Sequence, residues 1–95
     1  MKKKLKLTYL KKATKFLKKN AHISEEEVDA LVIRFVKSHF YGIDINSDYK
    51  QMQGKLTDTY RIRKGNIRII VKVINDEVMI EAIISDIGYR GRIYK

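Results

Sequence analysis

Cysteine and proline are absent from the sequence, and histidine occurs only twice. Without cysteine there are no disulfides and no thiolate metal sites, and two histidines are too few for a convincing zinc site. No apolar run approaches the roughly 20 residues of a membrane-spanning helix, and the lysine-rich start lacks the apolar stretch of a signal peptide. No glycine-rich phosphate loop or dinucleotide fingerprint is present. We therefore expect a cytoplasmic protein without a metal ion or cofactor.

The length and composition describe one small folded domain. The chain has 95 residues, of which 44% are hydrophobic and 34% are charged, and this balance is typical neither of disordered chains nor of membrane proteins. A chain of this length can bury a single modest core. No internal repeat or low-complexity linker divides it, so we expect a single domain over residues 1–95.

The charge balance indicates the kind of partner. Lysine and arginine number 21 and aspartate and glutamate number 11, which gives a formal net charge of +10. Such an excess on a small body favours a polyanionic partner, most commonly nucleic acid. The alternative is a basic protein whose charge serves only solubility. Aromatic residues interleave with arginines in the C-terminal tail, and this favours nucleic acid.

The last third of the chain predicts an antiparallel meander. Residues 64–66 and 75–77 are short turn-forming links between β-branched segments, a pattern typical of consecutive hairpins. The predicted strands are Thr59–Arg63, Ile67–Ile74 and Val78–Ser85, followed by a short tail at Gly88–Tyr94.

Strand alternation predicts one apolar and one charged face. Arg61 and Arg63 share one face of the first strand, about 7 Å apart at two residues of strand rise. In the second strand, one face is wholly apolar and the other begins with Arg68.

The first half of the chain predicts two helices. Residues 1–7 suit an edge strand or a basic arm, and Thr8 is the expected N-cap of a helix over residues 9–19. Ser24 and Glu27 form a capping-box pattern at the start of a longer helix with an apolar stripe. Residues 41–56 show no regular pattern. The expected fold class is α+β, with two antiparallel N-terminal helices packed on a twisted, mainly antiparallel sheet.

Several short motifs stand in a fixed order along the chain. They are the lysine-rich first helix, Met52-Gln53-Gly54-Lys55-Leu56, Tyr60-Arg61-Ile62-Arg63, Gly65-Asn66-Ile67-Arg68-Ile69-Ile70, Asn75-Asp76-Glu77-Val78 and Ile87-Gly88-Tyr89-Arg90-Gly91-Arg92-Ile93-Tyr94. In this order they resemble the RelE/ParE superfamily of bacterial toxins from toxin–antitoxin modules. The resemblance covers nearly the whole chain, most loosely at residues 41–50, and it implies two helices packed on a twisted antiparallel sheet.

The resemblance implies two alternative functions. Members that resemble RelE cut messenger RNA in the ribosomal A site without metal, by attack of a ribose 2′-OH on the adjacent phosphate. Members that resemble ParE poison DNA gyrase without catalysis. The RelE-like function, which we favour, implies as partners a cognate acidic antitoxin, mRNA in the A site and the surrounding 16S and 23S rRNA. A basic RNA-binding module without toxicity is a third reading of the charge.

The RelE-like pattern, carried over by position, implies catalytic roles for Arg68, Arg90 and Tyr94. Arg68 would bind the scissile phosphate and Arg90 would share the charge that develops there, since guanidinium groups bind phosphate oxygens in a fixed fork. RNA binding is implied for a second set: Arg61, Arg63, Tyr89 and Arg92. Arginines on strands also commonly decorate a solvated face, so it is the resemblance that distinguishes the catalytic set.

The sequence leaves three candidates for the general base. This chain has Arg61 and Arg63 where the best-known member of the family has lysines, and arginine does not deprotonate in proteins. Tyr94 is the first candidate, beside arginines that would favour its phenolate. Tyr89 is the second, at a position where many relatives carry a histidine, and Asp86 is the third.

Overall fold

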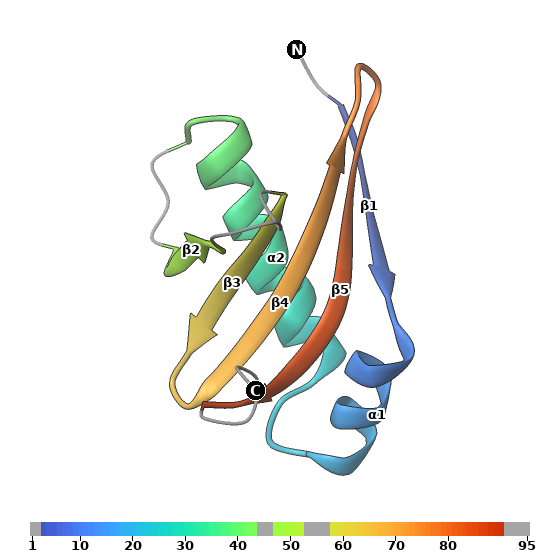
Figure 1. Ribbon diagram of the computed structural model, residues 1–95, viewed down its shortest axis with the longest axis vertical. Helices are drawn as coiled ribbons and strands as arrows, with labels where there is room; N and C mark the ends of the chain where they lie inside the picture. The colour runs from blue at the N-terminus through green and yellow to red at the C-terminus, as the bar shows by residue number, and fades with distance from the viewer. Residues whose placement is uncertain (1–2, 44–46, 53–57, 91–95) are drawn as a thin grey trace.

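The computed structural model describes residues 3–43, 47–52 and 58–90 (Figure 1). In this part of the chain, two helices and five strands follow one another as β1 (Lys4–Tyr9), α1 (Lys11–Lys19), α2 (Glu25–Phe40), β2 (Tyr49–Gln51), β3 (Thr59–Lys64), β4 (Ile67–Asn75) and β5 (Met79–Tyr89). The strands form one sheet in the order β1-β5-β4-β3-β2, in which only β1 and β5 are parallel neighbours. The predicted α+β class, with two helices and a mainly antiparallel sheet, is confirmed.

The predicted meander of β3, β4 and β5 is also confirmed, but its last strand is longer than expected. The register changes from Ile70 opposite Asp86 to Val71 opposite Ile84, which leaves Ser85 as the extra residue of a β-bulge. Ser85 Oγ donates a hydrogen bond to the carbonyl of Ile70 at 3.3 Å. Because the bulge keeps the two strands paired, β5 continues to Tyr89 and does not end at Ser85.

The start of α1 differs from the prediction. Thr8 and Tyr9 belong to β1, where they pair with Ile83 and Ile84 of β5, and α1 begins only at Lys11 without a side-chain cap. The Thr8 hydroxyl donates to Glu81 Oε2 at 2.8 Å instead of capping a helix. The N-cap prediction for Thr8 was therefore wrong, because pairing with a distant strand outweighed the local capping signal.

The start of α2 is as predicted. Ser24 Oγ accepts a hydrogen bond from the Glu27 backbone N–H at 3.1 Å, and the Ser24 N–H donates to Glu27 Oε1 at 3.1 Å. This reciprocal capping box satisfies two of the backbone donors that a helix start leaves without partners. In the described part of the chain, neither helix combines the length and apolar character needed to cross a membrane.

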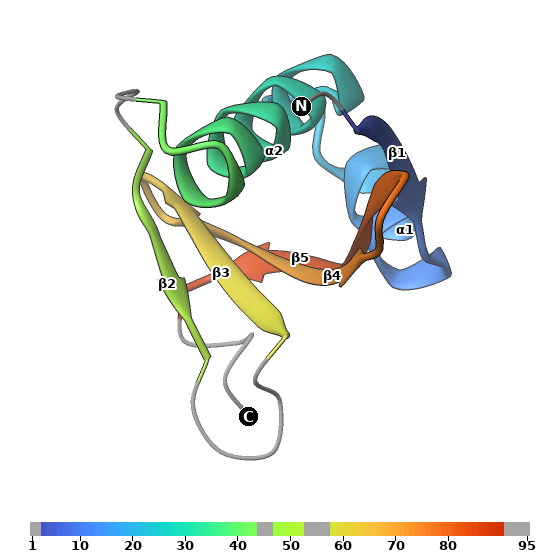
Figure 2. The same cartoon turned by 90° about the horizontal axis from the view of Figure 1, so that it is seen from above.

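The core lies between α2 and one face of the sheet (Figure 2). The largest fully buried side chains come from both layers: Val28, Val32, Phe35 and Val36 from α2, and Ile62, Ile69, Val71, Ile80 and Ile84 from the sheet. Burial of each such side chain contributes about 1.5–3 kcal/mol of transfer free energy. This face of the meander is therefore committed to packing, and its other face is the one available to a ligand.

Candidate nucleic-acid interface

The face of the sheet that points away from α2, here called the open face, carries most of the predicted site. On β3, Arg61 and Arg63 alternate with buried Tyr60 and Ile62, so both arginines lie on the open face. On β4, Arg68 lies on the same face, since its neighbours Ile67 and Ile69 are buried in the core. The predicted division into an apolar and a charged face is thus confirmed for these strands.

On the open face, positively charged residues stand directly opposite each other in two places, each time on two neighbouring strands. Arg63 of β3 is directly opposite Arg68 of β4, and Lys50 of β2 is directly opposite Arg61 of β3. Side chains in directly opposed positions are close, and like charges placed there destabilise a sheet. Two such pairs side by side favour a face that binds an anion.

Arg68 is held in place by the turn between β3 and β4. Its side chain is buried, with only 6% of the residue exposed, and Nη1 donates to the carbonyls of Gly65 at 2.7 Å and Ile67 at 3.1 Å. The turn itself depends on Gly65, whose φ of +58° lies in the left-handed region. Among the described residues, none accepts a hydrogen bond from Nε or Nη2 of Arg68. A buried cation with neutral partners is stabilised by an approaching anion.

Arg63 already has a partner. Its Nε donates to Asp48 Oδ2 at 2.5 Å, and its backbone N–H donates to the Asp48 carbonyl at 2.9 Å. About half of each side chain is exposed, with 53% for Arg63 and 55% for Asp48. Exposed ion pairs of this kind contribute roughly 0–1 kcal/mol, so a phosphate can replace Asp48 at little cost.

The β-bulge at Ser85 decides which side chains of β5 reach the open face. Before the bulge, even-numbered residues such as Ile84 are buried, and after it the odd-numbered Ile87 is buried. The change of parity places Asp86 on the open face, three rungs from the last pair of the ladder, Ile67 and Tyr89. Arg90 follows the same alternation, because its N–H extends the ladder by donating to the carbonyl of Asn66 at 2.7 Å. The side chain of Arg90 is exposed.

Tyr89 lies on the helix side of the sheet, away from Arg68. Its hydroxyl donates to Asn20 Oδ1 at 2.8 Å and lies 2.9 Å from His22 Nε2, and its ring stacks against His22 with centroids 5.8 Å apart. These contacts anchor the end of β5 to the α1–α2 link. The structure therefore does not bring Tyr89 together with the arginines, and a contact of Tyr89 with RNA stays a prediction.

Tyr94 and Arg92 lie outside the described residues, so their predicted roles stay predictions. The described part of the interface comprises Arg61, Arg63, Arg68 and Arg90 of the predicted set. It also contains Asp86, which the register places diagonal to Arg68, with Cβ atoms of such neighbours roughly 7–8 Å apart. Of the three base candidates, Asp86 is the one that the described open face carries.

His39 takes part in packing on the helix side. Its Nδ1 lies 3.1 Å from the Tyr49 hydroxyl and its Nε2 lies 3.1 Å from the Tyr60 hydroxyl. Burial raises the pKa of the Tyr60 hydroxyl, and the neighbouring Tyr49 and Asp58 raise it further. Because Tyr60 stays protonated over the physiological range, it acts here as a hydrogen-bonding partner of His39 within the core.

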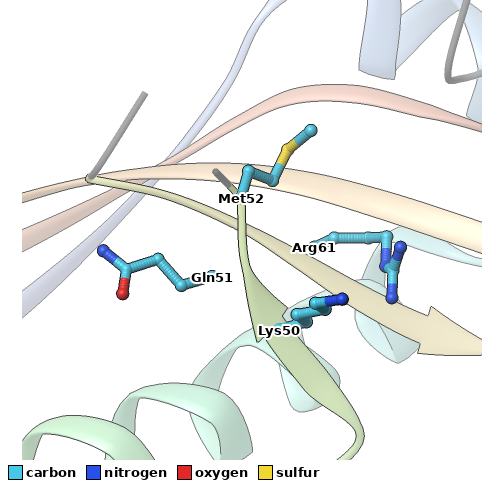
Figure 3. Close-up of a pocket in the computed structure, with 4 residues that line it drawn as sticks. All are labelled: Lys50, Gln51, Met52 and Arg61. Carbon is cyan, nitrogen blue, oxygen red and sulfur yellow. The ribbon is translucent and has the colours of Figure 1, made fainter. Parts of the chain in front are cut away.

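Lys50 was not predicted as a site residue, because β2 was not predicted. Lys50, Gln51, Met52 and Arg61 line a hollow of about 150 Å³ beside β2 (Figure 3). A larger hollow, of about 560 Å³, lies between β1 and α2 and is mainly apolar. Of these two hollows among the described residues, the smaller one joins the open face. The three residues of β2 are one apolar residue, Tyr49, followed by the polar Lys50 and Gln51, so no alternation marks the strand in the sequence.

The described acidic and histidine side chains do not gather in groups of three or more that would hold a metal ion. The arrangement of the open face can bind phosphate oxygens with several guanidinium groups and offer Asp86 as a proton acceptor beside them.

Sequence comparisons find neither a matching family model nor a matching curated protein. The structure is similar to YafQ from E. coli strain BL21(DE3), with a TM-score of 0.64 and 10% identity, covering 97% of this chain and 100% of that chain. It is similar to the YoeB/ParE toxin from Agrobacterium tumefaciens, with a TM-score of 0.63 and 8% identity over 90% of this chain and 98% of that one. A chain of the RelB–RelE antitoxin–toxin complex from Methanococcus jannaschii gives a TM-score of 0.56 and 24% identity, covering 92% and 94%.

These likenesses establish the fold. The chain shares its fold with these toxin structures, in agreement with the resemblance seen in its sequence.

Proposed function

We propose that this protein is the toxin of a toxin–antitoxin pair and that it cleaves messenger RNA on the ribosome without a metal ion. The shared toxin fold and the net charge of +10 support the proposal. The observation that carries it is the opposed pair of Arg63 and Arg68 on the open face, with Arg68 buried and fixed by backbone carbonyls. A cation held in a fixed position can stabilise the negative charge that develops on phosphate oxygens during cleavage.

The reaction follows from the chemistry of RNA. The 2′ oxygen of one ribose forms a bond to the adjacent phosphorus, and the bond from phosphorus to the 5′ oxygen of the next nucleotide breaks. A base takes the 2′ proton and the leaving 5′ oxygen receives a proton. Negative charge grows on the other phosphate oxygens, where Arg68 donates from a fixed position and Arg90 from an exposed one.

The geometry of the open face favours Asp86 as the general base. Asp86 lies on the open face diagonal to Arg68, so it is placed to accept the 2′ proton from an RNA that Arg68 binds. Tyr89 is directed to the helix side by Asn20 and His22. Tyr94, the first candidate from the sequence, is proposed as the acid that protonates the leaving oxygen or as an alternative base.

The proposed partners follow from the same face. An acidic antitoxin that covers the open face would neutralise the arginines and block access of RNA. Structural neighbours from Methanococcus jannaschii and Pyrococcus horikoshii OT3 are themselves antitoxin–toxin complexes, which supports an antitoxin partner. The remaining partners are mRNA in the ribosomal A site and the 16S and 23S rRNA around it, in the cytoplasm.

The test is a purified cell-free translation system with primer extension on the mRNA. We expect new cuts with the wild type that require translating ribosomes and that disappear with Arg68→Ala, Arg90→Ala and Tyr94→Phe. Arg34→Ala is the matched control, because Arg34 is an exposed arginine on α2, outside the open face. It should cut like the wild type.

Intact mRNA and undisturbed translation would contradict the ribonuclease. The alternative is a ParE-like toxin that inhibits DNA gyrase without catalysis. In that case expression in cells would induce a DNA-damage response while the mRNA stays intact. Salt-dependent RNA binding with neither cleavage nor toxicity would favour a simple RNA-binding module.

A further inference from the structure

The hollow beside β2 joins two cations that the sequence keeps far apart. Lys50 and Arg61 are direct partners across β2 and β3, and both line the hollow of about 150 Å³. Figure 3 shows the Lys50 ammonium and the Arg61 guanidinium directed to the same side of β2, whereas the Gln51 amide points the other way. Two positive groups directed into one small space favour an anion between them.

The lysine in this pair has no competing partner in the described structure. Among the described residues, none accepts a hydrogen bond from the Lys50 ammonium, whereas Arg63 nearby is paired with Asp48. Lys50 is exposed, so it can turn its three N–H donors toward a ligand without loss of a folded-state contact.

The size of the hollow limits the ligand. A water molecule occupies about 30 Å³ of the liquid, and pockets for drug-sized ligands have roughly 300–1,000 Å³. At about 150 Å³ the hollow has room for a phosphate group, and the rest of a nucleotide would extend out of it. Met52 gives it one apolar wall, suited to the edge of a ribose.

The spacing of the two cation pairs selects RNA over a single anion. Arg61 and Arg63 are two residues apart on β3, which corresponds to about 7 Å along the strand. Arg63 belongs to the pair with Arg68, and Arg61 belongs to the pair with Lys50. Successive phosphates of an extended single strand have a similar spacing, so the two pairs match two neighbouring phosphates of one RNA chain.

We propose that Lys50 and Arg61 form a subsite for one phosphate of the RNA, adjacent to the phosphate that Arg68 and Arg90 contact. The subsite rests on the proposed function, since the RNA is the substrate of that reaction. Lys50 is a binding residue here and takes no part in the transfer of protons. The subsite sets the register of the RNA, because it fixes which linkage stands over Arg68.

The test uses ribosomes programmed with an mRNA in which one phosphate is replaced by an uncharged methylphosphonate. The replaced linkage is placed one nucleotide before or one nucleotide after the cut, and kcat/KM for cleavage is measured with the wild type and with Lys50→Gln. With all phosphates charged, Lys50→Gln should lower kcat/KM about tenfold, which corresponds to the loss of one charged hydrogen bond. For the wild type, the uncharged linkage at one of the two positions should cause a similar loss.

The decisive measurement combines the Lys50→Gln protein with the mRNA that carries the uncharged linkage. If Lys50 binds that phosphate, the uncharged linkage causes no further loss in Lys50→Gln, because the two changes remove the same interaction. Lys37→Gln is the control, an exposed lysine on α2 that should behave like the wild type with both mRNAs. The melting temperature of Lys50→Gln should equal or exceed that of the wild type, since a cation opposite Arg61 has been removed.

The outcomes separate the subsite from the function. The subsite is overturned if the wild type cleaves and neither Lys50→Gln nor either uncharged linkage changes kcat/KM. The proposed ribonuclease function is then unaffected. If Lys50→Gln cleaves like the wild type but binds the antitoxin more weakly, the hollow binds an antitoxin carboxylate. That result also overturns the RNA subsite. Absence of any cleavage by the wild type contradicts the proposed function, and the subsite fails with it.

Discussion

Arg63 on β3 and Arg68 on β4 stand directly opposite each other, yet their environments differ. The Arg63 guanidinium is half exposed and paired with the Asp48 carboxylate, whereas the Arg68 guanidinium is buried and bound by the carbonyls of Gly65 and Ile67. One arginine is therefore neutralised and easily released, and the other is fixed and keeps its charge for a ligand.

The first prediction separates catalysis from stability. Arg68→Ala removes two hydrogen bonds to the β3–β4 turn, so it should lower the free energy of unfolding by about 1–2 kcal/mol as well as the cleavage rate. Arg90→Ala should lower the cleavage rate about 10²–10³-fold, as for the loss of one charge-stabilising donor, with a stability change within about 0.5 kcal/mol because Arg90 is exposed. Urea unfolding and cleavage on programmed ribosomes measure the two effects. Equal loss of stability in both variants would contradict the assignment.

The second prediction concerns the pair of Arg63 and Asp48. Asp48→Asn releases Arg63 and removes a negative charge from the open face, so KM for programmed ribosomes should fall by up to about fivefold. Glu77→Gln makes the same change of charge at the distant β4–β5 turn and serves as the control. A fall in KM of the same size for both variants would show a general effect of charge and not a released Arg63.

The third prediction compares two candidates for the general base. Asp86→Asn should lower kcat about 10²–10⁴-fold, the usual contribution of a general base. Tyr89→Phe loses its hydrogen bonds to Asn20 and His22 and should lower the free energy of unfolding by about 1 kcal/mol, with kcat close to that of the wild type. Measurement of kcat with saturating ribosomes decides between them, and a large fall in kcat for Tyr89→Phe alone would reverse the assignment.

The fourth prediction is a pH dependence of stability. Burial raises the pKa of the Tyr9 hydroxyl, which donates to Asp29 Oδ1 at 2.5 Å, and the hydrogen bond and charge of Asp29 raise it further. The unfolded tyrosine ionises near pH 10, so this contribution is complete below about pH 10. Above that pH the unfolded chain loses a proton that the folded chain keeps, so stability falls, by at most about 1.4 kcal/mol per pH unit for this group and by less because solvent screens the partly exposed hydroxyl.

Urea unfolding between pH 8 and pH 11 checks this sign. Tyr9→Phe should be less stable than the wild type at pH 8 and should lose stability more slowly above pH 10. Asp29→Asn should also reduce the alkaline loss, because it removes the carboxylate that keeps the Tyr9 proton. Parallel curves for all three proteins would exclude Tyr9 as the source.

The sequence predicted those parts of the fold that depend on local signals. The capping box of Ser24 and Glu27 and the turn links of the meander are short motifs with one dominant conformation, and both were found where expected. The wrong start of α1 has a non-local cause, since Thr8 and Tyr9 pair with β5 more than 70 residues later. A three-residue strand such as β2 is too short for its periodicity to be recognised.

The part of the site that could be predicted is the part set by the alternation of side chains along a strand. Strand alternation placed Arg61 and Arg63 together, but the register that opposes Arg63 to Arg68 depends on long-range pairing. The bulge at Ser85 reversed the parity of β5, which directs Tyr89 to the helices and Asp86 to the open face. Since no local signal marks this bulge, the direction of those two side chains could not be predicted.

The central claim is that the open face cuts RNA through the ribose 2′-OH. The most direct measurement is single-turnover cleavage on ribosomes programmed with mRNA that carries either ribose or 2′-deoxyribose at the cut nucleotide, with wild type, Arg90→Ala and Arg34→Ala proteins. We predict rapid cutting of the ribose mRNA by the wild type and Arg34→Ala, slow cutting by Arg90→Ala, and no cutting of the deoxyribose mRNA by any of them. Cutting of the deoxyribose mRNA, or wild-type rates with Arg90→Ala, would contradict the account.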